Sequence, residues 1–176
     1  MTLSVHHRLL AVVINDENGR MACRIQRLSF WSAQNEIYAS GNKLAYTTDI
    51  LAGLSSAVDD QAKQRRYVAY CARDQSKVVA SASPEYAKSQ SLLPVLRTPR
   101  VGALKICSKY GELEIRRAGQ KELVISGMQG KTGHIYLSPL SGVSSIRWDA
   151  MPSMEFGAVL LAFIGYMLRE DEACLV

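Results

Sequence analysis

The stretch Phe156–Leu168, "FGAVLLAFIGYML", decides how the rest of this sequence is interpreted. It contains no charged residue and is followed directly by the charged "REDE" of Arg169–Glu172. As a helix it would span about 20 Å at roughly 1.5 Å per residue, whereas the hydrocarbon core of a bilayer requires about 20 apolar residues. Because a helix that is apolar on all sides must be surrounded on all sides, we predict a buried helix at about 155–168.

The rest of the chain predicts strands. Between Leu9 and Trp148, short runs rich in Val, Ile, Leu and Tyr are separated by Gly, Asp, Asn and Ser, which is typical of antiparallel strands joined by tight turns. Turn residues predict hairpins at Asp16–Gly19, Ser40–Asn42 and Asp74–Ser76, because Asn and Gly tolerate the positive φ angles of such turns. The expected fold class is therefore mainly β.

Two further segments refine this prediction. The runs "VGALKICS" (101–108) and "ELEIRR" (112–117) alternate apolar and polar residues, which places one face of the sheet in water. Residues 51–62 have helix-like apolar spacing and are followed by Arg65 and Arg66, which would favour a helix C-terminus. A short helix and an irregular crossover are equally compatible with that segment.

Many antiparallel strands followed by one apolar helix form an uncommon combination. With its "DENGRMA" (16–22) and "SGNKLAY" (40–46) turns and its closing "MEFGAVLLAFIGYML" (154–168), the chain resembles the tubby-like superfamily. That superfamily groups tubby C-terminal domains, LURP-one-related proteins and phospholipid scramblases. The resemblance implies a closed antiparallel barrel of about twelve strands around a central C-terminal helix, with residues 1–176 forming a single domain.

The composition of the apolar helix supports a central position. Gly157, Ala158, Ala162 and Gly165 are small, and we expect them to let the helix approach the strands closely. Each glycine inside a helix lowers the stability of the helix by about 1 kcal/mol relative to alanine. We therefore expect close packing to require glycine at these positions. The alternative is a tail-anchored membrane helix in which Ala158 and Ala162 form a small-xxx-small contact.

No enzymatic signature is present. Gly130-Lys131-Thr132 matches the end of a P-loop, but Ile125 stands where the first glycine belongs, and a β-like run follows. His6, His7 and His134 have no accompanying nucleophile motif. The sequence therefore predicts no catalytic, cofactor-binding or metal-binding residue. The four cysteines, which are Cys23, Cys71, Cys107 and Cys174, contain no CxxC pair and are expected to be reduced and mostly buried.

Basic residues are the remaining candidates for a binding site. A net charge of +5 favours anionic partners, and several converging cations can hold a phosphorylated headgroup by charge-assisted hydrogen bonds. Lys105 and Lys109, in contrast, can pair across a hairpin with Glu112 and Glu114. The candidates for headgroup binding are Arg65, Arg66, Arg116, Arg117, Lys121 and Lys131.

The function expected from these features is non-enzymatic binding. The resemblance to lipid-associated barrels implies a peripheral phospholipid-surface module, or a scaffold for an acidic protein. The alternatives are an intracellular carrier with a small apolar ligand beside the central helix, and the tail-anchored protein. Few aromatic residues and no RRM, OB or helix-turn-helix signature argue against nucleic acid. Because no secretory signal begins the chain, we expect a cytoplasmic location with peripheral membrane contact.

Overall fold

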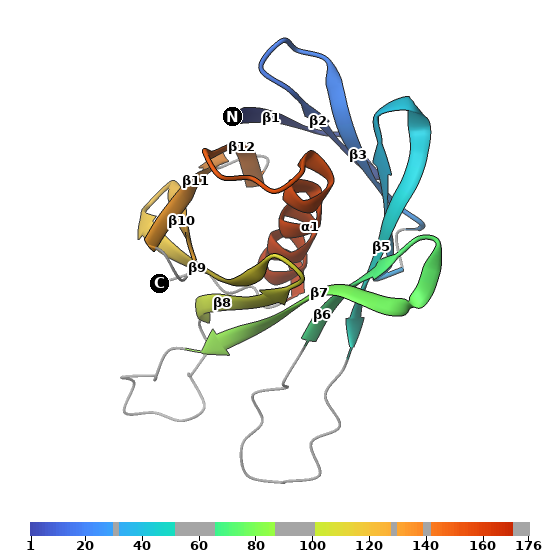
Figure 1. Ribbon diagram of the computed structural model, residues 1–176. Coiled ribbons are helices and arrows are strands. Elements are labelled where there is room, and N and C mark those ends of the chain that lie inside the picture. Colours follow the sequence, from blue (N-terminus) through green and yellow to red (C-terminus); the bar gives the residue numbers. More distant parts are fainter. Residues whose placement is uncertain (30–31, 52–65, 87–100, 128–129, 139–141, 171–176) are drawn as a thin grey trace, which may run out of the picture.

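A computed structural model of the chain describes residues 1–29, 32–51, 66–86, 101–127, 130–138 and 142–170. In this part of the chain twelve strands form a closed antiparallel barrel, and one helix, α1 (Met154–Glu170), lies inside it (Figure 1). This confirms the predicted fold class. The strands are β1 (Thr2–His7), β2 (Ala11–Asn15), β3 (Met21–Arg27), β4 (Asn35–Ala39), β5 (Lys43–Leu51), β6 (Arg66–Cys71), β7 (Asp74–Tyr86), β8 (Val101–Ser108), β9 (Gly111–Gly119), β10 (Glu122–Gly127), β11 (Gly130–Ser138) and β12 (Gly142–Trp148).

The barrel has the simplest possible topology. Each strand pairs with the next strand in the sequence, and β12 pairs with β1 to close the ring. In the closing pair, Leu3 lies opposite Ile146 and Ser4 lies opposite Ser145. Closure leaves no sheet edge open to pairing with another chain. Residues 52–65, which include Arg65 and all of the segment with helix-like spacing except Leu51, lie outside the described residues, and Leu51 ends β5.

The first two predicted hairpin turns are confirmed. Asp16 Oδ1 accepts hydrogen bonds from the backbone N–H groups of Asn18 and Arg20, each at 2.9 Å. Gly19 has a φ of 74°, a conformation in which a Cβ atom is disfavoured. The second turn is a single 3-10 turn, η1 (Ser40–Asn42), in which Gly41 and Asn42 both have positive φ.

The third predicted turn is placed two residues too late in the sequence. Residues 72–73 form the actual connection, and Asp74 already begins β7. Asp74 Oδ1 accepts hydrogen bonds from the backbone N–H of Ser76 at 3.1 Å and from its hydroxyl at 2.6 Å. The register between β6 and β7 shifts at this point. The Asp-x-Ser signal therefore marks a bulge inside a strand, because the same local hydrogen bonds serve turns and bulges.

The wall of the barrel follows the predicted alternation. Leu104 and Ile106 of β8 are buried against the core, while Lys105 and Cys107 are exposed. On β9, Ile115 is fully buried and Arg116 is exposed. Because successive side chains of a strand point to opposite faces, the outer face of this sheet carries the charges and the inner face packs around α1.

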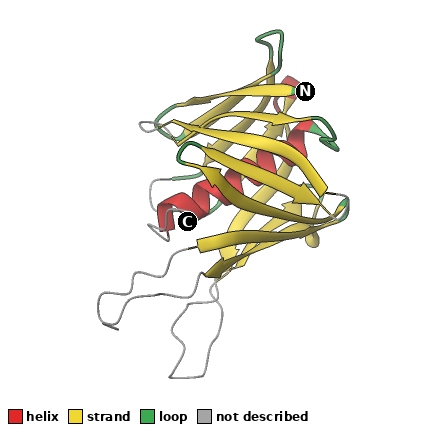
Figure 2. Cartoon of the chain, turned by 90° about the vertical axis from the view of Figure 1, so that its left-hand side faces the viewer, coloured by secondary structure: helices red, strands yellow, loops and turns green. Residues whose placement is uncertain are grey.

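The helix is fixed at its N-terminus by a cap and by its apolar surface. Ser153 Oγ accepts a hydrogen bond from the backbone N–H of Phe156 at 3.1 Å, which is the usual N-cap arrangement. Glu155 lies in the first turn, where its charge is favourable to the helix dipole. Residues 156–164 are all buried. Figure 2 shows α1 running through the barrel with strands around it.

The small residues of α1 have two different roles. A Cβ atom added to Gly157 would lie 2.9 Å from Met151 Sδ and 3.6 Å from Leu3 Cδ1, so this glycine does allow close packing. A Cβ atom added to Gly165 would meet no heavy atom within 4 Å. The prediction of close packing is therefore wrong at Gly165, because this residue faces an open space between the helix and the strands.

Candidate functional site

The structure distributes the predicted cationic residues over several strands. Arg66 begins β6, and its Nη2 donates a hydrogen bond to Ser81 Oγ at 3.0 Å. Arg116 projects from the outer face of β9 and forms an ion pair with Glu114. Arg65 lies outside the described residues, and Lys131 is described only as a backbone position in β11.

Two of the predicted residues share one turn. Arg117 donates from Nε to the carbonyl of Gly119 and from Nη2 to that of Gln120, both at 2.8 Å. Lys121 is exposed in the same β9–β10 connection. Arg117 and Lys121 therefore lie at one end of the barrel, whereas Arg66 is separated from β9 by β7 and β8.

A mixed-charge groove lies beside Arg66. It has a volume of about 690 Å³ and is lined by Arg66 and Lys105 together with Glu112 and Glu114. Lys105 Nζ lies 3.1 Å from Glu85 Oε1, so its ion pair is not the predicted one with Glu112 or Glu114. A groove that carries both signs of charge offers no concentrated positive field for a phosphate group.

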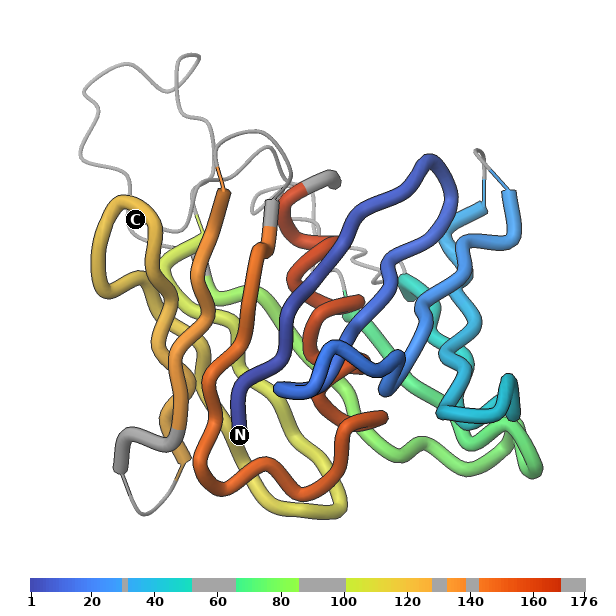
Figure 3. Tube along the Cα trace, turned by 90° about the horizontal axis from the view of Figure 1, so that it is seen from above, coloured from blue at the N-terminus to red at the C-terminus, as the bar shows by residue number. Residues whose placement is uncertain are grey.

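The barrel end at which α1 finishes has a distinct surface. It comprises the β1–β2 turn (8–10), the described part of the β3–β4 loop and the β9–β10 turn (120–121), and we call it the helix C-terminal end (Figure 3). Leu9 is 83% exposed and Leu28 is 51% exposed at this end. The backbone N–H of Arg27 donates to the carbonyl of Leu10 at 2.8 Å, which ties the β1–β2 turn to the end of β3.

The charges at the helix C-terminal end are unequally satisfied. Asp49 accepts a hydrogen bond from Gln34 at 2.9 Å, and Glu36 accepts one from Tyr38 at 2.7 Å. Arg8 and Lys121 are exposed, and neither forms an ion pair with another described residue. This end therefore combines exposed leucines with exposed cations.

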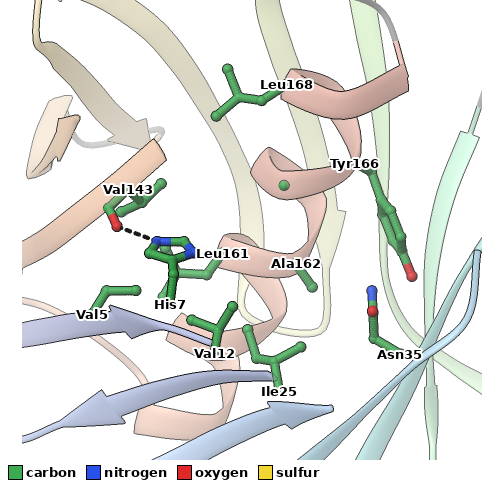
Figure 4. A pocket seen from close by; sticks show the side chains of 11 residues that line it. Val5, His7, Val12, Ile25, Asn35, Val143, Leu161, Ala162, Tyr166 and Leu168 are labelled. Carbon is green, nitrogen blue, oxygen red and sulfur yellow. Dashed lines mark hydrogen bonds between the residues drawn. The ribbon is translucent and has the colours of Figure 1, made fainter. Parts of the chain in front are cut away.

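A cavity opens beside α1 near the same end. Its volume is about 320 Å³, and it lies between the helix and the strands β1 to β4 and β12 (Figure 4). Gly165 and Ala162 contribute its helix side. The apolar side chains that line it are Val5, Val12, Ile25, Val143, Leu161 and Leu168.

Polar groups occupy defined places in this cavity. Asn35 Nδ2 donates a long hydrogen bond of 3.4 Å to Thr48 Oγ1, which lies 2.7 Å from the hydroxyl of Tyr166. His7 Nε2 donates to the carbonyl oxygen of Val143 at 2.6 Å (Figure 4). The sequence prediction missed Asn35, Thr48 and Tyr166. The only sign of them in the sequence is that a polar residue occupies an inward-facing position in an otherwise apolar strand or helix.

No cluster of three metal-ligating side chains occurs among the described residues. Burial, with a contribution from Glu155, raises the pKa of the Cys23 thiol to about 12, which keeps it protonated. Of the described cysteines, Cys23 is buried, Cys71 is partly buried and Cys107 is exposed, so the expectation of mostly buried thiols holds only for Cys23.

The structure also bears on the tail-anchor alternative. Within the described residues, no helix combines the length and the apolar character that crossing a bilayer requires. The residues Phe156–Ile164 of α1 are instead buried by the strands of the barrel. In this structure α1 is a helix of the barrel core.

The chain was compared with known families, curated proteins and solved structures. No family model matches the sequence, and no curated protein matches it. The X-ray structure of the Arabidopsis thaliana protein AT5G01750 aligns with a TM-score of 0.61 at 11% identity, covering 96% of this chain and 91% of that one. At this identity the likeness concerns the fold alone. The chain and the Arabidopsis protein share one barrel architecture over almost their whole lengths.

Proposed function

We propose that this chain is a non-enzymatic tubby-like domain that binds anionic phospholipid surfaces peripherally, through the helix C-terminal end of its barrel. The observation that carries the proposal is the exposed Leu9 beside the exposed Arg8, on the same end as Lys121 and Arg117. The fold shared with AT5G01750 is compatible with the tubby-like resemblance. A cytoplasmic location belongs to the same proposal.

The two kinds of residue at this end act together on a membrane. Each Lys or Arg near an anionic leaflet contributes about 1 kcal/mol, and moving a leucine side chain out of water contributes about 1.5–3 kcal/mol when its burial is complete. Neither term alone gives stable attachment, and membrane binding generally needs two signals. Leu9 at the tip of a turn bonded to β3, with Arg8 beside it, supplies both signals within two residues.

The cations also fit an acidic protein, for which the domain would act as a scaffold. A membrane and an acidic protein would contact Leu9 in different ways. A membrane accepts an inserted leucine at any lateral position, whereas a protein needs a matching pocket. The membrane is favoured because Leu9 projects at 83% exposure from a turn of only a few residues.

Flotation with vesicles across a salt series tests the proposal. We expect binding to phosphatidylserine-containing vesicles at low salt, weak binding to phosphatidylcholine alone, and a strong decrease as salt shortens the Debye length to roughly 8 Å. Leu9→Ser should reduce binding to the anionic vesicles. Val78→Ser is the matched control, because Val78 is 51% exposed near the opposite end of the barrel. Absence of binding to anionic vesicles at low salt would overturn the proposal.

A further inference from the structure

The cavity beside α1 is larger than the gaps of an ordinary packed core. Protein interiors contain few voids larger than a water molecule, and this cavity measures about 320 Å³. It lies at the lower end of the range of small-molecule pockets, which is about 300–1,000 Å³. The space is therefore of the right size for a small ligand.

The helix leaves this space open at one residue. Gly165 is exposed to the cavity, and an added Cβ atom there would have no heavy atom within 4 Å. Glycine is a poorer helix former than alanine, and no contact in the structure requires glycine at this position. A larger side chain at position 165 would fill the cavity from the helix side, so the glycine maintains its volume.

The lining determines what the cavity can hold. Its aliphatic side chains come from β1, β2, β3, β12 and α1, and cavities lined in this way bind apolar guests. The described residues that line it include no Lys, Arg, Asp or Glu. A charged group placed there would lose its hydration without gaining a counter-charge. The guest must therefore be uncharged inside the cavity and mostly hydrocarbon.

One polar side chain in the cavity lacks a full set of partners. Asn35 is only 7% exposed, and its single hydrogen bond is the long one from Nδ2 to Thr48. Its Oδ1 accepts no hydrogen bond from a described residue. His7 donates through Nε2, which leaves Nδ1 as an acceptor in the neutral ring. Both residues can thus accept a hydrogen bond from a guest.

We propose that the cavity binds one single-chain amphiphile whose hydrocarbon chain packs against α1 and whose uncharged hydroxyl or amide group hydrogen-bonds Asn35. This site is distinct from the membrane-docking surface and does not depend on it. The ligand can be taken up from a docked membrane or from solution, and its chemistry is the same in both cases.

Displacement of an apolar fluorescent probe, N-phenyl-1-naphthylamine, tests the site on the intact chain in the absence of vesicles. We expect 1-decanol to displace the probe, and decanoate to do so far less well because its carboxylate would be desolvated. In the same titration the amide NMR signal of Gly165 should shift. If 1-decanol neither displaces the probe nor shifts Gly165, or if decanoate binds as well as 1-decanol, the proposal is wrong.

Two substitutions locate the ligand. Gly165→Leu should abolish displacement by 1-decanol, while Gly165→Ala, which adds only a methyl group, should retain it. Asn35→Leu should lower the affinity for 1-decanol by about three- to tenfold, as expected for one lost hydrogen bond. It should leave the affinity for decane unchanged. Undiminished binding of 1-decanol by a folded Gly165→Leu protein would overturn the assignment.

The two proposals fail separately. Gly165→Leu should still float with anionic vesicles, because the helix C-terminal end is unchanged. Arg8→Glu should still bind 1-decanol, because Arg8 does not line the cavity. In the unmodified protein, absence of flotation together with binding of 1-decanol would remove the membrane proposal alone, and flotation without binding of 1-decanol would remove the cavity proposal alone.

Discussion

The hydroxyl of Tyr166 lies 2.7 Å from Oγ1 of Thr48, and this hydrogen bond joins the central helix to a strand of the barrel wall 118 positions away in the sequence. Both residues are almost completely buried. Because an unpaired buried hydroxyl costs roughly 1–3 kcal/mol, Tyr166→Phe should lower the free energy of unfolding by about that amount. Urea unfolding measures the change.

The double variant separates this hydrogen bond from packing. In Tyr166→Phe/Thr48→Val both hydroxyls of this hydrogen bond are absent, so neither is left without the other. Asn35 loses its bond to Thr48 in the single variant Thr48→Val as well, so that loss cancels in the comparison. We expect the double variant to be less destabilised than the sum of the two single variants, as is usual for residues in direct contact. Strict additivity would show that the bond contributes nothing.

The enclosure of α1 makes a second prediction. Phe163 is fully buried, with its ring centroid 6.2 Å from that of Tyr67. Phe163→Asp places an unpaired charge in the core, which costs more than a domain of ordinary stability can lose. We expect an unfolded protein by circular dichroism. Leu9→Asp introduces the same charge at an exposed position and should leave the fold intact. A cooperatively melting Phe163→Asp protein would contradict an enclosed helix.

Two glycines are expected to respond oppositely to the same substitution. A Cβ atom at Gly133 would lie 2.9 Å from the backbone oxygen of Arg147 and 3.0 Å from Trp148 Cγ. Gly133→Ala should therefore lower the midpoint of thermal unfolding through overpacking, at a cost of about 1–3 kcal/mol. Gly165→Ala should raise it, since alanine is favoured in a helix by up to about 1 kcal/mol and the space is open. A decrease in both variants would mean that the cavity is not open at Gly165.

Cysteine reactivity provides a test of burial at a defined pH. An ordinary thiol is partly ionised at pH 8, but burial raises the pKa of Cys23 from 9.0 to about 12, and the thiolate is the reactive form. Cys107 is exposed on the outer face of β8. Iodoacetamide at pH 8, followed by peptide mass spectrometry, should modify Cys107 in the folded protein and leave Cys23 unmodified until denaturant is added. Rapid modification of native Cys23 would contradict its position in the core.

Local signals in the sequence were sufficient for most of the fold. The apolar run at 155–168 predicts α1 within two residues at each end. This is possible because the length of a buried helix, and the charged residues that flank it, are visible in one continuous stretch of sequence. The turn at Asp74–Ser76 was misplaced because its hydrogen bonds stabilise a bulge as well as a turn. The fold depends on the spacing of apolar residues along the chain, and that spacing is visible in a single sequence.

The candidate sites were far less predictable. The cavity depends on the relation of Gly165 to Val5 and Val143, which come from the two ends of the chain and meet only when β12 pairs with β1. No sequence motif accompanies His7, yet its ring bonds to the carbonyl oxygen of Val143 at the cavity. Whether cations converge is likewise set by strand order, and Arg66 and Lys121 are separated by several strands.

The central claim, membrane docking through the helix C-terminal end, is tested most directly by matched charge reversals in flotation at low salt. Arg8→Glu/Lys121→Glu changes two exposed cations at that end, and Arg20→Glu/Lys43→Glu makes the same change in charge at the opposite end. With each cation worth about 1 kcal/mol near an anionic surface, the first pair should lower binding to phosphatidylserine vesicles by at least about tenfold. The second pair should bind nearly as well as the unmodified protein. Equal loss of binding in the two pairs would mean that net charge alone attracts the protein, and it would contradict a defined docking end.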